Sequence, residues 1–90
     1  MPHSTLHKNL RHDRVLVVDL ELTCWDGLPP EGERPEIIEI GVAEIDLKRD
    51  EISRTISMLT RPTASRISPF CTDFTGITDE MVAADGISFE

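Results

Sequence analysis

The chain has 90 residues, 39% hydrophobic and 29% charged, which is enough for one small domain with a limited core. Asp and Glu number 17 against 9 Lys and Arg, so the formal net charge is −8. This acidic balance argues against a broad basic surface for nucleic acid, unless bound cations reverse the local field. No apolar run approaches the roughly 18–20 residues of a membrane span, so no membrane partner is expected.

The first 13 residues are polar and include His3, His7 and His12. They lack the apolar segment of a secretory signal and are expected to form a flexible leader. His3 and His7 have a spacing that binds metal on a helix, but a mobile tail is favoured in so unpatterned a segment. Two cysteines, Cys24 and Cys71, are too few for a disulfide framework, which favours reduced thiols and a cytoplasmic protein.

Residues 15–18 form a continuous apolar, β-branched run, which predicts a strand covered on both faces. The run ends in Asp19 and Glu21, which point to the same face of a strand and lie about 6.5 Å apart at Cα. Two carboxylates in this position, at the carboxyl end of a strand, can converge on one divalent cation. The alternative is that the strand simply ends here and its acids are solvated, since a D-x-E pattern alone is a weak signal.

Residues 26–35 hold two Gly and three Pro, which predicts an exposed loop. Residues 36–46 and 51–61 read as two further strands, and the short charged link between them favours an antiparallel hairpin. In the second of these, apolar side chains such as Ile52 and Ile56 alternate with polar ones, the pattern of a half-solvated edge strand. Pro62 is expected to end it.

Two short helices are expected next. Ser68 is suited to cap the first, with Pro69 at its first helical position. Thr78 is suited to cap the second. Ile77 and Val82 would then form a hydrophobic staple across this second cap.

Residues 17–25 read Val-Val-Asp-Leu-Glu-Leu-Thr-Cys-Trp and resemble the first exonuclease motif of the DEDD-type (DnaQ-like) 3′–5′ exonucleases. The Thr-Cys-Trp ending resembles the branch that contains the histone-mRNA exonuclease. Residues 36–41 and 70–78 resemble further segments of the same family, in the expected order. The resemblance implies an α/β, ribonuclease H-like exonuclease fold with sheet order 3-2-1-4-5 and its first three strands antiparallel, of which residues 14–90 would be an incomplete, N-terminal part.

The resemblance also implies hydrolysis of phosphodiesters at the 3′ end of single-stranded RNA or DNA, with release of nucleoside monophosphates. The cofactors would be Mg²⁺ or Mn²⁺, two ions in a complete site. By this likeness Asp19 would bridge both ions, and Glu21 would hold the ion that activates water. The branch favours RNA over DNA.

The same likeness places four residues near the terminal nucleotide. Leu22 and Thr23 would lie beside its sugar and base. Trp25 would border the base pocket, with packing on the loop as an equal alternative. Ile77 would pack against the base, an alternative to its role in the staple.

Three other residues are expected to stay outside the chemistry. Glu36 is expected to be solvated, and Glu39 to order nearby backbone. Cys24 has no adjacent base, so a small packing residue is favoured over a nucleophile.

The family pattern needs a further Asp on a later helix, a His as general base and a final Asp, and these have no counterpart here. We therefore expect the 90-residue chain to be inactive or nearly so. Its first strand would be an exposed apolar edge, open to self-association. The alternatives are a catalytically inactive nucleotide- or partner-binding module and, less favoured, an acidic interaction domain in which D-x-E is incidental.

Overall fold

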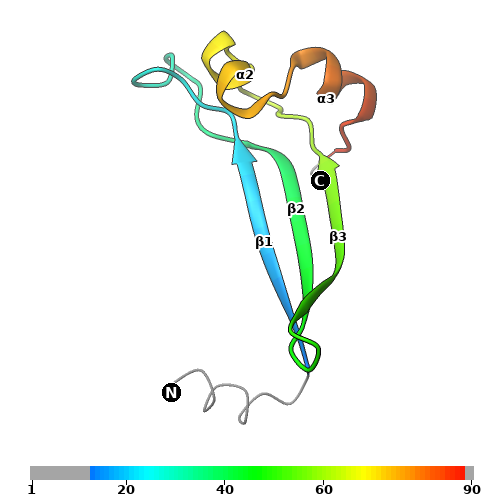
Figure 1. Cartoon of the computed structure of the whole chain (residues 1–90). Coiled ribbons are helices and arrows are strands. Elements are labelled where there is room, and N and C mark those ends of the chain that lie inside the picture. Colours follow the sequence, from blue (N-terminus) through cyan, green and yellow to red (C-terminus); the bar gives the residue numbers. More distant parts are fainter. Residues whose placement is uncertain (1–12, 89–90) are drawn as a thin grey trace.

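The computed structural model describes residues 13–88, and the expected leader lies outside them except for Asp13. The elements in this range follow in the order β1 (Arg14–Leu22), β2 (Ile37–Asp46), β3 (Glu51–Leu59), α2 (Pro69–Thr75) and α3 (Asp79–Asp85). The strands form one sheet in the order β1-β2-β3, and both pairings are antiparallel. Figure 1 shows a long ribbon of strands with both helices gathered at one end. The predicted order of elements is confirmed.

The buried core lies at the helical end of the sheet. Its members are Ile38, Ile67, Cys71, Ile77 and Val82. The pairing of β1 with β2 passes from Glu21–Glu39 directly to Leu22–Ile37 and so skips Ile38, which is fully buried. An extra residue of this kind bends a strand and changes the direction of its side chain. Here the extra residue is Ile38, the one β2 residue in this core cluster.

The caps of both helices form as predicted. The Ser68 hydroxyl accepts a hydrogen bond from the Cys71 amide at 3.0 Å, and α2 begins at Pro69. The Thr78 hydroxyl accepts from the Met81 amide at 3.1 Å. Ile77 and Val82 on either side of the second cap are both buried in the core, which fits the predicted staple.

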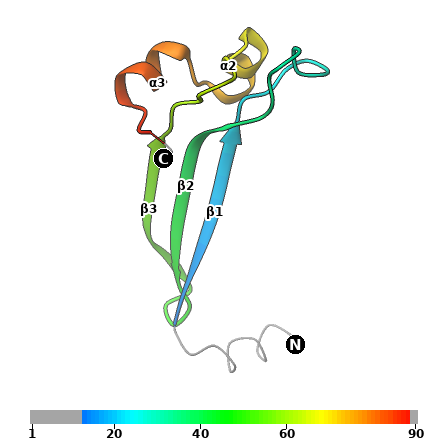
Figure 2. The same ribbon diagram turned by 180° about the vertical axis from the view of Figure 1, so that it is seen from behind.

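The cover predicted over both faces of residues 15–18 is absent from the part of the chain that the structure describes. Leu16 is 63% exposed and Val18 is 59% exposed. β1 is an edge strand with β2 as its neighbour, and both helices lie beyond the strand ends. Figure 2 shows from behind that the lower part of the sheet carries no helix on that side either. This apolar run is therefore the exposed edge that we expected of an incomplete domain.

β3 is the opposite edge of the sheet, as its alternating pattern predicted. Its apolar side is nevertheless exposed, because the described residues place nothing over Ile52 and Ile56. The strand ends at Leu59, earlier than predicted, and Pro62 is not what ends it. Thr60 instead forms an isolated parallel bridge with Ile87, which brings the end of the described chain back to the sheet.

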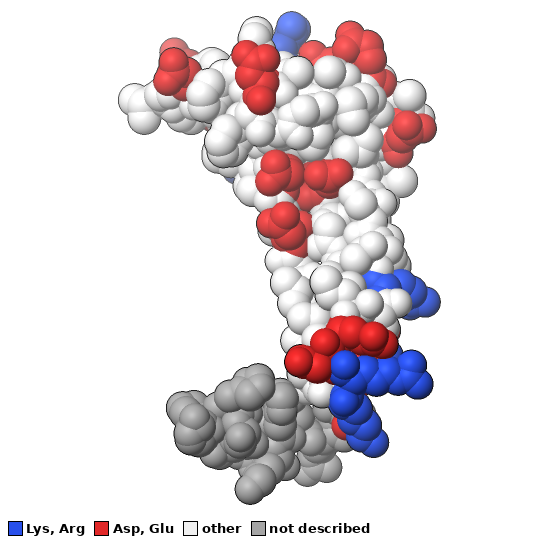
Figure 3. All heavy atoms as spheres, viewed as in Figure 1, with Lys and Arg blue, Asp and Glu red and all other residues white. Residues whose placement is uncertain are grey.

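Charges are paired at the end of the sheet away from the helices. Asp46 accepts hydrogen bonds from the amides of Lys48 and Arg49 at 3.0 and 3.1 Å. These bonds, that of Arg49 foremost, and the guanidinium of Arg14 lower the pKa of Asp46. Figure 3 shows acidic and basic side chains together at this end. Its basic residues are thus largely balanced by neighbouring carboxylates.

None of the helices within residues 13–88 is long and apolar enough to cross a membrane.

Gly86, directly after α3, packs against Arg61, which follows β3, and provides a test of this packing. Its amide bonds to the Val82 carbonyl, and its carbonyl accepts from the Arg61 side chain at 2.7 Å. A Cβ at this position would lie 2.4 Å from the Val82 carbonyl oxygen and 2.9 Å from Arg61 Cγ. We expect Gly86→Ala to lower the free energy of unfolding by about 1–3 kcal/mol, the usual cost of overpacking, when measured by urea denaturation.

Gly41→Ala is the matched control, because the same methyl group would lie no closer than 3.7 Å to the nearest heavy atom outside the adjoining residues. It should leave stability unchanged or slightly raised, since alanine costs less backbone entropy than glycine in a strand. Equal stability of Gly86→Ala and the wild type would contradict the tight packing described here.

Candidate active site

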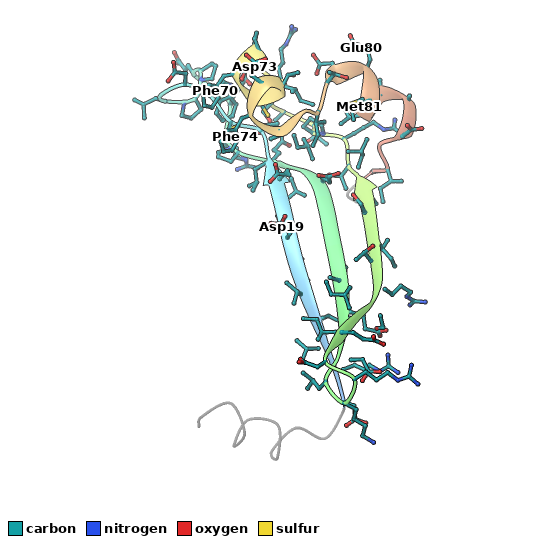
Figure 4. The ribbon with its side chains drawn as sticks, viewed as in Figure 1. Asp19, Phe70, Asp73, Phe74, Glu80 and Met81 are labelled. Carbon is teal, nitrogen blue, oxygen red and sulfur yellow. The ribbon has the colours of Figure 1, made fainter. Side chains whose placement is uncertain are left out.

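Asp19 and Glu21 lie in β1 near its helical end and, two residues apart, share one face of the strand as predicted. The pairing places Gly41 opposite Asp19 and Glu39 opposite Glu21. Residues directly opposite in an antiparallel pair also share a face, so Glu39 joins the two acids. Figure 3 shows acidic side chains gathered on the sheet below the helices, and Figure 4 shows Asp19 there.

The two β2 neighbours differ in what they do. Gly41 has no side chain, and a Cβ there would make ordinary van der Waals contact with Asp19, 3.7 Å from its carbonyl oxygen and 3.9 Å from its Cβ. Asp19 itself is exposed. Glu39 accepts a hydrogen bond from the Ser57 hydroxyl of β3 at 3.0 Å. Among the described residues, Glu39 is therefore hydrogen-bonded to a side chain and not to the backbone that we expected it to order.

The side chains of Asp19 and Glu21 are of the chemical type that binds a hard divalent cation. Asp19 and Glu21 offer carboxylate oxygens, the ligands that Mg²⁺ and Mn²⁺ prefer. Among residues 13–88, however, no three His, Cys, Asp or Glu side chains come together closely enough to hold a metal. The described part of the chain thus supplies a pair of ligands and not a complete site.

The residues predicted to contact a nucleotide fall into two groups. Leu22, the last residue of β1, and Trp25, in the segment that follows, are at least partly exposed. Thr23 is only 1% exposed, and its hydroxyl is engaged by the Glu36 amide at 2.9 Å and by the Ser65 hydroxyl at 3.0 Å. Ile77 is 3% exposed and packs in the core, the alternative that its sequence position offered. Neither buried side chain presents a surface for a base.

Two phenylalanines of α2 form an exposed feature that we did not single out from the sequence. The rings of Phe70 and Phe74 are stacked, with centroids 6.0 Å apart and planes at 7°. Phe74 is 74% exposed. Figure 4 shows both beside the end of β1 nearest the helices, beyond Asp19. Their spacing of four residues, which places side chains on one face of a helix, was the available signal.

Glu36 is half-buried and not simply solvated as predicted, because its carboxylate is the centre of a hydrogen-bond network. The donors are the amides of Thr63, Ala64 and Ser65 and the hydroxyls of Thr63 and Ser65. These bonds, that of the Ser65 hydroxyl foremost, lower the pKa of Glu36 to about 2. The sequence showed an acid beside a proline-rich loop and gave no sign of its distant partners.

Cys24 behaves as a packing residue. It lies against the core cluster, and burial, followed by the neighbouring thiol of Cys71 and the charge of Glu21, raises the pKa of the Cys24 thiol to about 11. A thiol in this state is poorly ionised near neutral pH and is a weak nucleophile. Both thiols are free.

Residues 16–88 match the family model described as Exonuclease, of the RNase T type. The chain belongs to this exonuclease family. It is 39% identical over 70 residues to the 3′–5′ exonuclease Snipper of Drosophila melanogaster, covering 76% of this chain and 25% of that protein. It is 38% identical over 72 residues to human 3′–5′ exoribonuclease 1, covering 79% of this chain and 20% of the relative. The chain thus spans a quarter or less of the length of these relatives.

Solved structures of the family have the same fold. The nuclease domain of 3′hExo, a DEDDh family member bound to rAMP, aligns with a TM-score of 0.76 and 35% identity, over 86% of this chain and 38% of that one. A 3′-exonuclease solved for 3′-end specific recognition of a histone mRNA stem-loop aligns with a TM-score of 0.75 and 34% identity, over 88% and 35%. The chain therefore has part of the ribonuclease H-like fold of the DEDD-type 3′–5′ exonucleases, the family that its three motifs predicted.

Glu36 predicts how stability depends on pH. Because its pKa falls from 4.5 in the unfolded chain to about 2 in the folded one, the folded state binds fewer protons between these values. The stability that this carboxylate supplies is complete above the unfolded pKa and is lost as the pH falls towards the folded pKa. Glu36→Gln removes this contribution, so its free energy of unfolding should fall less steeply with acid.

Urea unfolding followed by circular dichroism between about pH 3 and pH 6 measures the difference, with a limit of about 1.4 kcal/mol per pH unit for one proton. Asp46 titrates in both proteins and cancels. Glu31→Gln, the same change at an exposed loop position, is the control and should follow the wild type. Parallel curves for the wild type and Glu36→Gln would refute the assignment.

Proposed function

We propose that this chain provides the first acidic motif and part of the nucleotide-binding surface of a metal-dependent 3′–5′ exonuclease. The observation that carries the proposal is the Asp19–Glu21 pair on one face of β1, in a chain of the exonuclease family. The substrate is the 3′ end of a single-stranded nucleic acid, and the products are nucleoside monophosphates. RNA is favoured over DNA, since relatives are named exoribonucleases and one neighbour was solved with a histone mRNA stem-loop as its subject.

The cofactor we propose is Mg²⁺ or Mn²⁺, held in part by Asp19 and Glu21. Such ions activate water and stabilise the leaving oxygen of a phosphodiester. The two side chains hold negative charge close together, which a bound cation relieves. Asp19 is exposed, which leaves its carboxylate accessible for this purpose.

The exposed aromatic pair of α2 is our proposed platform for a nucleobase. Phe74 presents most of its ring to solvent, and the stacked Phe70 holds it in place. Stacking on an aromatic side chain contributes about 1–3 kcal/mol per base and tolerates any base. Leu22 and Trp25, at the nearby end of β1, are the other described contacts that we propose for the terminal nucleotide.

We propose that the isolated 90-residue chain has little or no nuclease activity. Support comes from the described residues, in which no third His, Cys, Asp or Glu lies close enough to complete a metal site with Asp19 and Glu21. A missing general acid or base alone costs about 10²–10⁴-fold in rate. The second candidate, a catalytically inactive nucleotide- or partner-binding module, is favoured by the same observation.

Two free thiols, one of them buried, support a reducing, cytoplasmic setting.

Ligand binding tests the proposed site. Titration of 5′-AMP in the presence of Mn²⁺, followed by Trp25 fluorescence, should show binding in the millimolar range. Asp19→Asn should abolish the dependence on Mn²⁺. Phe74→Ala should weaken AMP by about tenfold, from the loss of base stacking, whereas Leu28→Ala, a truncation at the fully exposed loop residue Leu28, should change nothing.

The same samples, given single-stranded RNA and Mg²⁺, should release no mononucleotide. Release that Asp19→Asn abolishes would overturn the proposed inactivity and establish the chemistry. No fluorescence response of the wild type at millimolar AMP would sink the nucleotide site.

We further propose that the chain associates with a second copy through the free edge of β1. The outer edge of this strand carries backbone groups without a neighbouring strand in residues 13–88, and Leu16 and Val18 beside it are exposed. An exposed apolar edge is a template for strand pairing, and a lysine on the edge opposes it.

Analytical ultracentrifugation over a range of concentrations should reveal a dimer that Val17→Lys weakens by at least tenfold. Thr55→Lys places the same charge on β3, the other edge, and should leave the dimer intact. Equal weakening by both variants would assign the contact elsewhere, and a wild-type monomer at about 100 μM would contradict the proposal.

A further inference from the structure

Thr23, directly after β1, is fixed by hydrogen bonds to Glu36, directly before β2. The Thr23 amide donates to the Glu36 carbonyl at 2.8 Å, and the Glu36 amide donates to the Thr23 hydroxyl at 2.9 Å. Thr23 and Glu36 thus hold each other through both backbone and side chain. The contact lies directly after Leu22, the last residue of β1.

The Glu36 side chain extends this contact to a third segment. Its carboxylate gathers residues 63–65, whose three consecutive amides all point at its two oxygens. Ser65 then links back, because its hydroxyl lies 3.0 Å from the Thr23 hydroxyl. Thr23, Glu36 and Ser65 therefore close a ring of hydrogen bonds, with Thr23 and Ser65 both buried.

A second connection holds the same segment on the side of α2. The Ser68 hydroxyl donates to the Cys24 carbonyl at 2.7 Å while it accepts from the Cys71 amide. Ser68 follows residues 63–65 along the chain, so the loop that is hydrogen-bonded to the Glu36 carboxylate also contains the residue that caps α2. The position of Trp25 and of the aromatic pair of α2 relative to β1 thus depends on one loop.

We propose that Glu36 is a positioning residue, whose carboxylate fixes residues 63–65 and, through Ser65 and Thr23, the nucleotide-binding segment behind the acidic pair. It acts at a distance from the metal and touches neither substrate nor ion. The inference rests on the proposed function, because that function assigns Leu22 and Trp25 to the nucleotide.

The role requires a carboxylate and not only a polar side chain of this size. Amide donors approach both oxygens: Thr63 and Ala64 reach one, and Ala64 and Ser65 reach the other. A glutamine in either orientation would turn its NH₂ group towards at least one backbone N–H. The low pKa of Glu36, about 2, agrees with an acid that stays ionised for this purpose.

Amide hydrogen exchange and AMP affinity, measured on the 90-residue chain, test the proposal. In Glu36→Gln the Thr23 amide should exchange about tenfold faster, the scale of one lost hydrogen bond, and the Val42 amide in the middle of β2 should accelerate by clearly less. The same variant should bind AMP with Mn²⁺ about tenfold more weakly. Glu31→Gln is the charge-matched control and should match the wild type in both measurements.

The outcomes separate this inference from the proposed function. Faster amide exchange confined to Thr23 in Glu36→Gln, with unchanged affinity for AMP, would overturn the positioning role in favour of a purely structural one. Equal acceleration of exchange at Thr23 and Val42 would do the same. A wild type that does not respond to AMP, with exchange still localised at Thr23, would overturn the nucleotide site and support the anchoring by Glu36.

Ser65→Ala provides a gentler variant if Glu36→Gln does not fold. It removes one hydroxyl and leaves the three backbone donors of residues 63–65 in place. Faster exchange at Thr23, smaller than in Glu36→Gln, would support the proposal, and an unchanged rate would refute it.

Discussion

The antiparallel pairing of β1 with β2 is the interaction on which the site and the core both depend. Its register sets Gly41 opposite Asp19 and Glu39 opposite Glu21, which decides what surrounds the acidic pair. At the end of the same ladder the register skips one residue, and Ile38 enters the core beneath the helices. A shift of one residue would reverse the faces of every side chain in the strand and would dismantle both features together.

Charge is paired at one end of this sheet and not at the other. At the hairpin end, carboxylates such as Asp46 are matched by Arg14 and Arg49, so little field remains. At the helical end, Asp19 and Glu21 have no ion pair among the described residues. An acidic chain of this kind can engage a polyanion only with help from bound cations. The net charge that argued against a nucleic-acid protein is thus compatible with an exonuclease.

The exposure of β1 and β3 has a simple physical origin. The described residues place cover only over the end of the sheet, so apolar residues such as Leu16 and Ile56 remain in water. This arrangement accords with a chain that spans 20–25% of the length of its relatives. Small domains bury a modest fraction of their surface in any case. At the helical end, hydrogen bonds around Glu36 and Ser68 add to the buried core.

The sequence by itself determined the succession of strands and helices along the chain, both helix caps and the acidic pair, because each depends on local patterns: alternation for Asp19 and Glu21, and capping chemistry at Ser68. The family followed from three short ordered motifs. Only the tertiary structure decided that Glu36 is an anchor, that Thr23 is buried, and that Phe74 is exposed. These properties depend on partners distant in the chain, such as Ser65 with Thr23, and no local pattern encodes a contact of that range.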